Sequence, residues 1–467
     1  MIIFSLPENP AHLGQNQETS LQQKSVETGS PISRTNIVKI LLGIVIIVII
    51  GFFIFSVAIP KFRDVQVSKV TLNYWGLWED ASIIQPIIAD FNREYPSIKV
   101  NYSKQDHKRY RERLVARIQN GIGPDIFRFH NTWVTMLSGV LLPLPSDTIT
   151  KAEFAKWFYP VVQKDLIKNG AIYGIPLEID TLALYINTNI FESARLSPPK
   201  DWVDFINHAR GLTVKDGSGQ IKTAGTALGT FNNVTHAPDI VSLLLVQNGV
   251  DLNNIAQDTE AAAEALAFYT SFTTAGGSST WNSSLDPSVV AFAKGNLAMY
   301  FGYSWDIFTI KAINPNLAFE IHPVPQLPNQ NMTIASYWAE GVSATSQYQK
   351  EALLFMKFLA KKETAQRFFT DASKTRTFGE PYARVDLADT LKSNLIVYPF
   401  VSQGNGAVSS FFASDTHDSG LNSQMNTYLG NAVNSIINGG SPQSAVGTLV
   451  QGVNQVLTQY TPTVESK

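Results

Sequence analysis

The chain of 467 residues contains no cysteine. This absence excludes disulfide bonds, zinc–thiolate sites and catalytic thiols. It also excludes a lipid-modified cysteine, so a peptide segment must provide any attachment to a membrane. The absence does not by itself indicate a compartment.

Charge of either sign is also scarce. Charged residues make up 16% of the chain, and the net charge is -2. A nucleic-acid-binding protein needs a clustered basic surface, so we expect no nucleic-acid partner. The sequence also lacks a Gly-Lys phosphate loop, paired histidines at metal-binding spacing and a Gly-x-Ser-x-Gly motif. We therefore predict no catalytic residues, no metal site and no cofactor.

One long apolar run is present. Residues 40–59 have no charge, and only two glycines and one serine interrupt the apolar side chains. At about 1.5 Å per residue, this run spans roughly 30 Å, the thickness of a bilayer core. We predict an uncleaved transmembrane signal anchor over residues 37–59, with residues 40–59 in the lipid bilayer. Ser56-Val57-Ala58 has the form of a signal-peptide cleavage site, so processing after Ala58 stays open.

Polar segments flank the predicted anchor. Residues 1–36 are rich in Gln, Ser, Asn and Glu, which predicts a disordered N-terminal tail. Residues 60–68 begin with proline and mix charges, which indicates a short linker to the folded part.

From residue 69 onward the chain alternates between strand and helix patterns. The predicted elements are a strand at 70–75, a helix at 80–95, a strand at 98–102, a helix at 106–120 and a strand at 125–129. This order predicts an α/β fold with a parallel sheet covered by helices. Ligands of such sheets bind beyond the carboxyl ends of the strands, so the loops after Trp75 and Phe129 are expected at a binding surface.

The later sequence predicts a second α/β lobe. Helical spacing dominates residues 200–295, and a nearly continuous strand pattern at 172–187 is suited to link two lobes. We expect chain crossings near 178–183, 299–304 and 374–381. The predicted first lobe is 69–180 with 303–376, and the predicted second lobe is 181–302 with 377–460. Two sequential domains joined by one linker remain the alternative.

Several short phrases occur in a specific order. They are Gly123-Pro124-Asp125-Ile126-Phe127 with Trp133 and Leu141–Leu144; Tyr173-Gly174-Ile175-Pro176 running into Glu178, Asp180, Tyr185, Asn187 and Phe191; Phe292, Gly295, Ala298 and Met299; Trp305; and Ala339–Ser343. Their order and spacing over residues 69–460 resemble the family 1 extracellular solute-binding proteins, which include the maltose-binding proteins.

The resemblance implies both a fold and a function. The fold would be the two-lobed type II periplasmic-binding-protein ("Venus flytrap") architecture. The protein would not be an enzyme. It would capture a small-molecule solute, a sugar or oligosaccharide, outside the cytoplasm and deliver it to the permease subunits of an ABC-type importer. With the predicted anchor, we expect a single-pass protein of the cell membrane. The maltose-binding type places an acid and a base where this chain has Thr132 and Trp133, so maltose itself is not expected.

A sugar site needs carboxylates and amides for hydroxyl groups and aromatic rings for C–H faces. The candidate ligand-binding residues are Trp75, Trp78, Glu79, His130, Asn131, Trp133, Glu178, Asp180, Tyr303, Trp305 and Trp338, with Asn232 and His236 as weaker candidates. Glu178 and Asp180 are two residues apart on a predicted strand, so their side chains point to the same face. A carboxylate pair can hydrolyse glycosides, but hydrolases hold the sugar between carboxylates from different elements.

Other functions remain open at this stage. A membrane-tethered sensor of the same fold would report the solute to a partner, and the family also takes up solutes that are not sugars. A glycosidase would turn over a chromogenic glycoside. The sequence does not name the solute or the permease.

Overall fold

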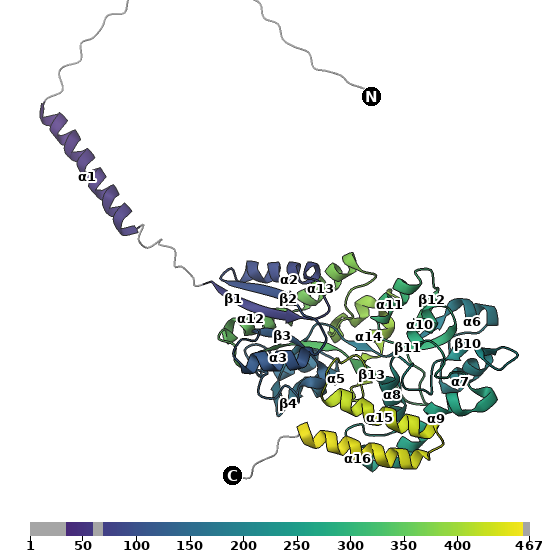
Figure 1. Cartoon of the computed structure of the whole chain (residues 1–467). Coiled ribbons are helices and arrows are strands. Elements are labelled where there is room, and N and C mark those ends of the chain that lie inside the picture. The colour runs from purple at the N-terminus through teal and green to yellow at the C-terminus, as the bar shows by residue number, and fades with distance from the viewer. Residues whose placement is uncertain (1–33, 59–68, 461–467) are drawn as a thin grey trace, which may run out of the picture. The chain divides into compact units, whose positions relative to one another are not determined.

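The computed structural model describes residues 34–58 and 69–460 (Figure 1). The chain divides into two compact units, Met1–Val67 and Ser68–Lys467. The predicted linker and nearly all of the predicted N-terminal tail lie outside the described residues.

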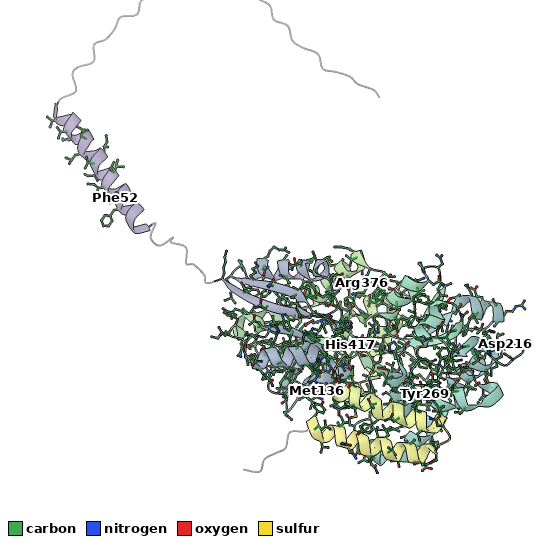
Figure 2. All side chains as sticks on the ribbon, in the orientation of Figure 1. Phe52, Met136, Asp216, Tyr269, Arg376 and His417 are labelled. Carbon is green, nitrogen blue, oxygen red and sulfur yellow. The ribbon has the colours of Figure 1, made fainter. Side chains whose placement is uncertain are left out.

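The first unit contains one helix, α1 (Arg34–Ala58). Its described apolar side chains are exposed, and Phe52 projects from the helix surface with 71% of its area accessible (Figure 2). Among the helices as far as their residues are described, none is long and apolar enough to cross a membrane. The predicted transmembrane anchor is therefore not confirmed.

The first sheet of the second unit has the strand order β2-β1-β3-β14-β6. Its strands are β1 (Val70–Gly76), β2 (Ile98–Lys104), β3 (Ile126–His130), β14 (Trp338–Val342) and β6 (Ile175–Pro176). The strand β1 pairs in parallel with β2 and β3, whereas β14 runs antiparallel to β3 and β6. The predicted β-α-β-α-β order is confirmed, with α2 (Ala81–Glu94) and α3 (Tyr110–Gln119) between these strands.

Helical periodicity explains how α2 covers this sheet. Its apolar residues recur on one face, and Ile84, Ile87 and Phe91 on that face are almost completely buried. The ring of Phe91 meets Phe355 of α12 (Gln349–Leu359) edge to face at 4.9 Å. Helix α13 (Lys362–Thr375) lies beside α2 (Figure 1). These contacts build the first core, which surrounds the first sheet.

The second sheet has the strand order β12-β8-β11-β10-β9. Its strands are β8 (Ala183–Asn187), β9 (Val214–Lys215), β10 (Ile221–Thr226), β11 (Leu297–Gly302) and β12 (Phe319–His322). The helices of this region include α7 (Trp202–Gly211), α8 (Ala237–Gln247), α9 (Thr259–Thr274), α10 (Ser288–Ala293), α15 (Leu421–Ile437) and α16 (Pro442–Tyr460). A Cβ atom on Gly225 would lie 1.8 Å from the Ala209 carbonyl oxygen, so glycine is required where β10 approaches α7. Buried side chains around this sheet form the second core.

Smaller elements complete the second unit. They are α4 (Lys151–Trp157), α5 (Pro160–Leu166), β4 (Ile167–Lys168), α6 (Thr188–Ala194), α11 (Asp306–Ile313), α14 (Tyr398–Ser402) and the 3₁₀ turns η2 (Asn131–Trp133), η3 (Ile255–Gln257), η4 (Gly276–Ser278), η5 (Val385–Leu391) and η6 (Gly404–Gly406).

A three-stranded sheet, β15-β13-β7, connects the two cores. Its strands are β7 (Asp180–Thr181), β13 (Thr333–Ser336) and β15 (Ala407–Val408). The predicted continuous strand at 172–187 is instead divided into β5 (Ala171–Ile172), β6, β7 and β8, because successive segments pair in different sheets.

The position of the second crossing differs from the expectation. The chain returns to the first core within β13, since Ile334 belongs to the second core and Ala335 to the first. We expected a return near 299–304, but β12 forms backbone hydrogen bonds with β8 in the second sheet. The rest of the predicted lobe boundaries stays a prediction.

The first core contains a buried ion-pair network. Arg128 on β3 and Glu340 on β14 are fully inaccessible, and Arg128 Nε donates to Glu340 Oε1 at 2.7 Å. Arg128 also donates through Nη1 to Glu79 in the loop after β1. Burial alone would lower the pKa of Arg128, but the two carboxylates raise it well above its ordinary value. This network therefore holds a charged guanidinium between two carboxylates inside the core.

We predict that Arg128→Met lowers the free energy of unfolding of the full-length chain by about 3–5 kcal/mol at pH 7. The reason is that two buried carboxylates lose their compensating charge. Urea unfolding followed by tryptophan fluorescence measures the change. The matched control is Arg93→Met, whose side chain is 73% exposed and pairs with Asp90 at the surface. The control should cost less than about 1 kcal/mol. Equal effects of the two substitutions would contradict the prediction.

Candidate functional site

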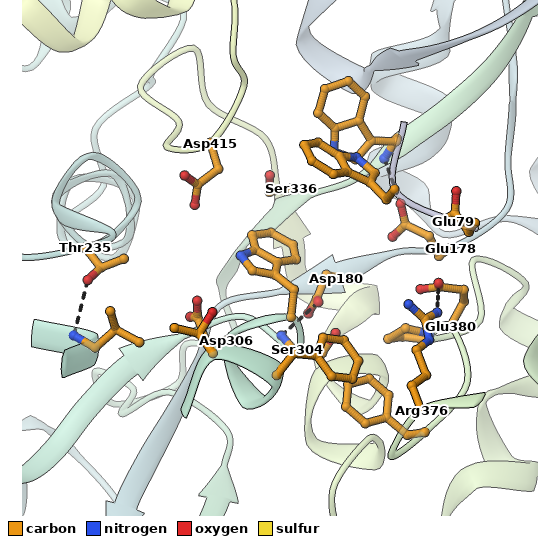
Figure 3. Close-up of a pocket in the computed structure, with 18 of the residues that line it drawn as sticks. Glu79, Glu178, Asp180, Thr235, Ser304, Asp306, Ser336, Arg376, Glu380 and Asp415 are labelled. Atoms are coloured by element: carbon orange, nitrogen blue, oxygen red, sulfur yellow. Dashed lines mark hydrogen bonds and ion pairs between the residues drawn. The ribbon is translucent and has the colours of Figure 1, made fainter. Parts of the chain in front are cut away.

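Residues from both cores line a cavity of about 470 Å³ (Figure 3). The lining residues are Trp78, Glu79, Glu178, Asp180, Thr235, Val289, Ser304, Trp305, Asp306, Phe308, Thr309, Ser336, Trp338, Arg376, Phe378, Glu380, Pro381, Asp415 and His417. The volume is within the range of about 300–1,000 Å³ that is typical of small-molecule sites.

The fold explains why these residues meet. Trp78 and Glu79 follow β1, at the carboxyl end of a parallel strand, where the sequence predicted a binding surface. Asp180 and Ser336 lie on β7 and β13 of the connecting sheet and pair across it. Trp305 lies at the N-terminal end of α11, directly after β11 of the second sheet. The cavity therefore lies where both cores and the connecting strands come together.

Aromatic rings provide the apolar surface of the cavity. Trp305 stacks on Tyr303 with 4.4 Å between ring centroids and an angle of 16°. Trp338 meets Trp78 edge to face at 5.4 Å and is supported from behind by Trp133 at 5.2 Å. Such rigid rings can pack against the C–H faces of a sugar.

Two carboxyl groups lie at the connecting sheet. Glu178 Oε1 accepts a hydrogen bond from the Trp338 N–H at 3.0 Å, and Asp180 Oδ2 accepts one from the Ser304 N–H at 2.8 Å. Burial raises the pKa of Glu178 to about 7, although the positive charge of Arg128 opposes the shift. Burial also raises the pKa of Asp180 well above its usual range, and the nearby acids Glu178 and Asp306 raise it further.

Asp306, the residue after Trp305, forms a buried ion pair with His236. Asp306 Oδ2 accepts hydrogen bonds from His236 Nε2 at 2.7 Å, from the Tyr300 hydroxyl at 2.9 Å and from the Tyr303 N–H at 3.0 Å. Burial alone would lower the pKa of His236, but Asp306, with smaller contributions from two other acids, raises it to about 9. His236 is therefore protonated at neutral pH and fixes the position of Asp306.

The remaining charged groups come from late segments of the chain. Arg376 forms an ion pair with Glu380, and both residues point into the cavity (Figure 3). His417 lies beside His107 with 4.4 Å between ring centroids. Burial and the neighbouring His107 lower the pKa of His417 to about 4, so its ring is neutral at pH 7.

The structure brings six of the eleven predicted site residues into the cavity lining. They are Trp78, Glu79, Glu178, Asp180, Trp305 and Trp338. Their contact with a ligand stays a prediction.

The other five predicted residues do not line the cavity. Trp75 lies under the guanidinium of Arg117, and Trp133 is fully buried. The ring of His130 forms hydrogen bonds with Thr132 and Ser336, and the side chain of Asn131 donates to Asp165 and Ser409. The hydroxyl group of Tyr303 donates to Asp239. Three of them form a layer behind the lining, since Trp133 and His130 both contact Trp338 and Tyr303 supports Trp305.

The sequence reasoning missed several lining residues. Asp306 directly follows the predicted Trp305, and this adjacency was a usable signal. Arg376, Glu380, Asp415 and His417 lie in segments without strand or helix periodicity, so no local pattern indicated them.

Within residues 34–58 and 69–460, no group of three or more His, Asp or Glu side chains could hold a metal ion.

Residues 75–366 match the family model described as bacterial extracellular solute-binding protein. A multiple sugar-binding protein of Streptococcus mutans is 22% identical over 325 residues, which cover 64% of this chain and 73% of that protein.

Solved structures with a similar fold include two bacterial binding proteins. The sugar-binding protein MalE from Xanthomonas citri has a TM-score of 0.67 and 18% identity, over 84% of this chain and 98% of that chain. An ABC transporter solute-binding protein from Thermotoga lettingae, bound with alpha-D-tagatose, has a TM-score of 0.64 and 20% identity, over 83% of this chain and 100% of that chain. At these identities the likeness establishes the two-domain α/β fold.

We predict that His236 makes the stability of the full-length chain dependent on pH. Its folded-state pKa of about 9 is above the unfolded value of about 6.5, so the folded state binds more protons between these values. The stabilisation is complete below pH 6.5 and is lost as the pH rises through 9. The free energy of unfolding of the wild type minus that of His236→Gln should therefore fall by about 3 kcal/mol from pH 6 to pH 10.

Urea unfolding at several pH values measures this difference. The control is His322→Gln, because the His322 side chain is 31% exposed and pairs with Glu320 on the surface. A difference between wild type and His236→Gln that does not change with pH would contradict the prediction.

Proposed function

Because the chain belongs to the bacterial extracellular solute-binding protein family, we propose that it captures a sugar or oligosaccharide in the cavity and delivers it to an ABC-type importer. The observation that best supports this proposal is the composition of the cavity lining. Indole rings of Trp78, Trp305 and Trp338 lie beside buried carboxyl groups and several hydroxyl side chains. This is the combination that the faces and edges of a sugar require.

The names of similar proteins agree with a sugar ligand. The Streptococcus mutans relative is named a multiple sugar-binding protein, and the Thermotoga lettingae structure was solved with alpha-D-tagatose. These names describe those proteins, and the ligand of this chain is our proposal.

We further propose that the solute favours a closed arrangement of the two cores. Trp78 belongs with the first core and Trp305 with the second, so a solute between them contacts both cores only when they are close together. The connecting strands β7 and β13 are where the backbone would rotate. The permease would then recognise the closed form.

The proposal also includes attachment to the cell membrane, with the folded unit outside the cytoplasm. Its support is the sequence, in which residues 40–59 are uncharged and long enough for a bilayer core. The chain has no cysteine for a lipid anchor. Delivery to a permease benefits from such attachment because the binding protein then stays at the membrane surface.

We predict that Trp305→Ala weakens binding of the cognate sugar at least about tenfold. The substitution removes an indole ring that lines the cavity and is held in place by stacking on Tyr303 behind it. Calorimetric titration of the full-length chain with a panel of mono- and oligosaccharides identifies the sugar and measures the loss. The matched control is Trp157→Ala, since Trp157 lies outside the cavity under Arg384. Unchanged affinity in Trp305→Ala, or no binding of any sugar by the folded wild type, would contradict the proposal.

We predict that the full-length chain sediments with membranes and resists extraction by alkaline carbonate. Deletion of residues 37–59 should release the protein into the soluble fraction, because no other run of this length in the sequence is almost entirely apolar. Mass spectrometry of the isolated protein should find residues 1–58 retained. A soluble wild-type protein whose first residue is Ile59 would instead indicate a cleaved signal peptide.

A further inference from the structure

Acidic groups outnumber basic groups in the cavity lining. The lining contains six carboxyl side chains, those of Glu79, Glu178, Asp180, Asp306, Glu380 and Asp415. Arg376 is the one lysine or arginine among the lining residues, and the neutral ring of His417 adds no charge.

Four of the six carboxyl groups have cationic partners. Glu79 pairs with Arg128, Glu380 with Arg376, and both Asp306 and Asp415 with His236. Within the described part of the chain, no lysine, arginine or histidine nitrogen lies within 4 Å of a carboxyl oxygen of Glu178 or Asp180. Among the described residues, these two acids, two positions apart in the chain, form no ion pair, although the charge of Arg128 acts on Glu178 from a greater distance.

Asp180 also has an oxygen without any hydrogen-bond partner. Its side chain is 2% exposed and lines the cavity, and Oδ2 is occupied by the Ser304 N–H. Among the described residues, no donor reaches Asp180 Oδ1. A buried oxygen left in this way costs free energy unless a ligand satisfies it. Figure 3 shows Asp180 among the lining residues, joined to Ser304 by this hydrogen bond.

We propose that the solute is an amino sugar whose protonated amine binds between Glu178 and Asp180. An ammonium group has three donors and a positive charge, so it can satisfy Asp180 Oδ1 and supply the missing ionic partner together. The indole of Trp305 would pack against the sugar ring, and the hydroxyl groups of Ser336 and Thr309 would meet the sugar hydroxyls. This inference depends on the proposed sugar-capture function and narrows its ligand class.

The protonation of the two acids agrees with this assignment. Burial raises the pKa of Glu178 to about 7 and that of Asp180 well above its usual range. A cation between them would lower both pKa values again and convert the acids to carboxylates. A neutral sugar would bring no charge that could lower either pKa.

The test uses three disaccharides with the same β-1,4-linked skeleton that differ at C2. They are the disaccharide of glucosamine, its N-acetylated counterpart and cellobiose, titrated into the full-length chain at pH 6.5 with tryptophan fluorescence and calorimetry. We expect the amine to bind at least about tenfold more tightly than either neutral sugar, and its advantage should shrink with added salt.

Two variants distinguish charge recognition from general damage. Asp180→Asn should reduce affinity for the amine at least about tenfold more than it reduces affinity for the neutral sugars. The matched control is Asp147→Asn, which makes the same change on an exposed residue outside the cavity and should leave all affinities unchanged. Thermal unfolding of each variant confirms that it is folded.

The outcomes separate this inference from the proposed function. Equal or tighter binding of the neutral sugars would overturn the amino-sugar assignment and leave sugar capture standing. Equal losses for amine and neutral sugars in Asp180→Asn would also overturn it, because the side chain would then serve hydroxyl groups. No binding of any sugar by the folded wild type would overturn both.

Discussion

The guanidinium of Arg128 links the first core to the wall of the cavity. It lies between Glu340 in the sheet and Glu79 in the loop after β1, with no access to water. A buried charge requires such partners, and the pair with Arg128 holds Glu79 and its loop against the first core. The adjacent Trp78 is thereby positioned at the cavity surface. The positive charge also opposes the effect of burial on Glu178.

The connecting sheet imposes the second constraint. Its strands pass from one core to the other at β7 and β13, and Asp180 and Ser336 on these strands face the cavity. A ligand that binds there contacts the segment where the two cores would move relative to each other. In our proposal, a charged group of the ligand bound by Glu178 and Asp180 at this segment would favour closure of the two cores.

Much of the fold could be predicted from local patterns. Helix α2 differs from its predicted range by one residue at each end, because buried residues recur at helical spacing. The division of residues 172–187 into four short strands could not be predicted, since it depends on pairing with strands far away in the sequence. Prediction of the site from the sequence was limited in the same way, by contacts between distant segments. Trp305 and Asp180 were found from ordered sequence phrases, but Arg376 and His417 reach the cavity only through tertiary packing.

The central claim is that a sugar binds between the two cores and draws them together. The absence of cysteine allows two spin labels to be attached without background, for example at Lys99→Cys on β2 and Lys222→Cys on β10, both exposed positions. Pulsed electron paramagnetic resonance then measures the distance between the labels with and without the sugar identified by titration. We predict a shift of the distance distribution to one narrow population on addition of sugar, and no shift when Trp305→Ala is present. A distribution that stays the same when the sugar saturates the protein would contradict this account.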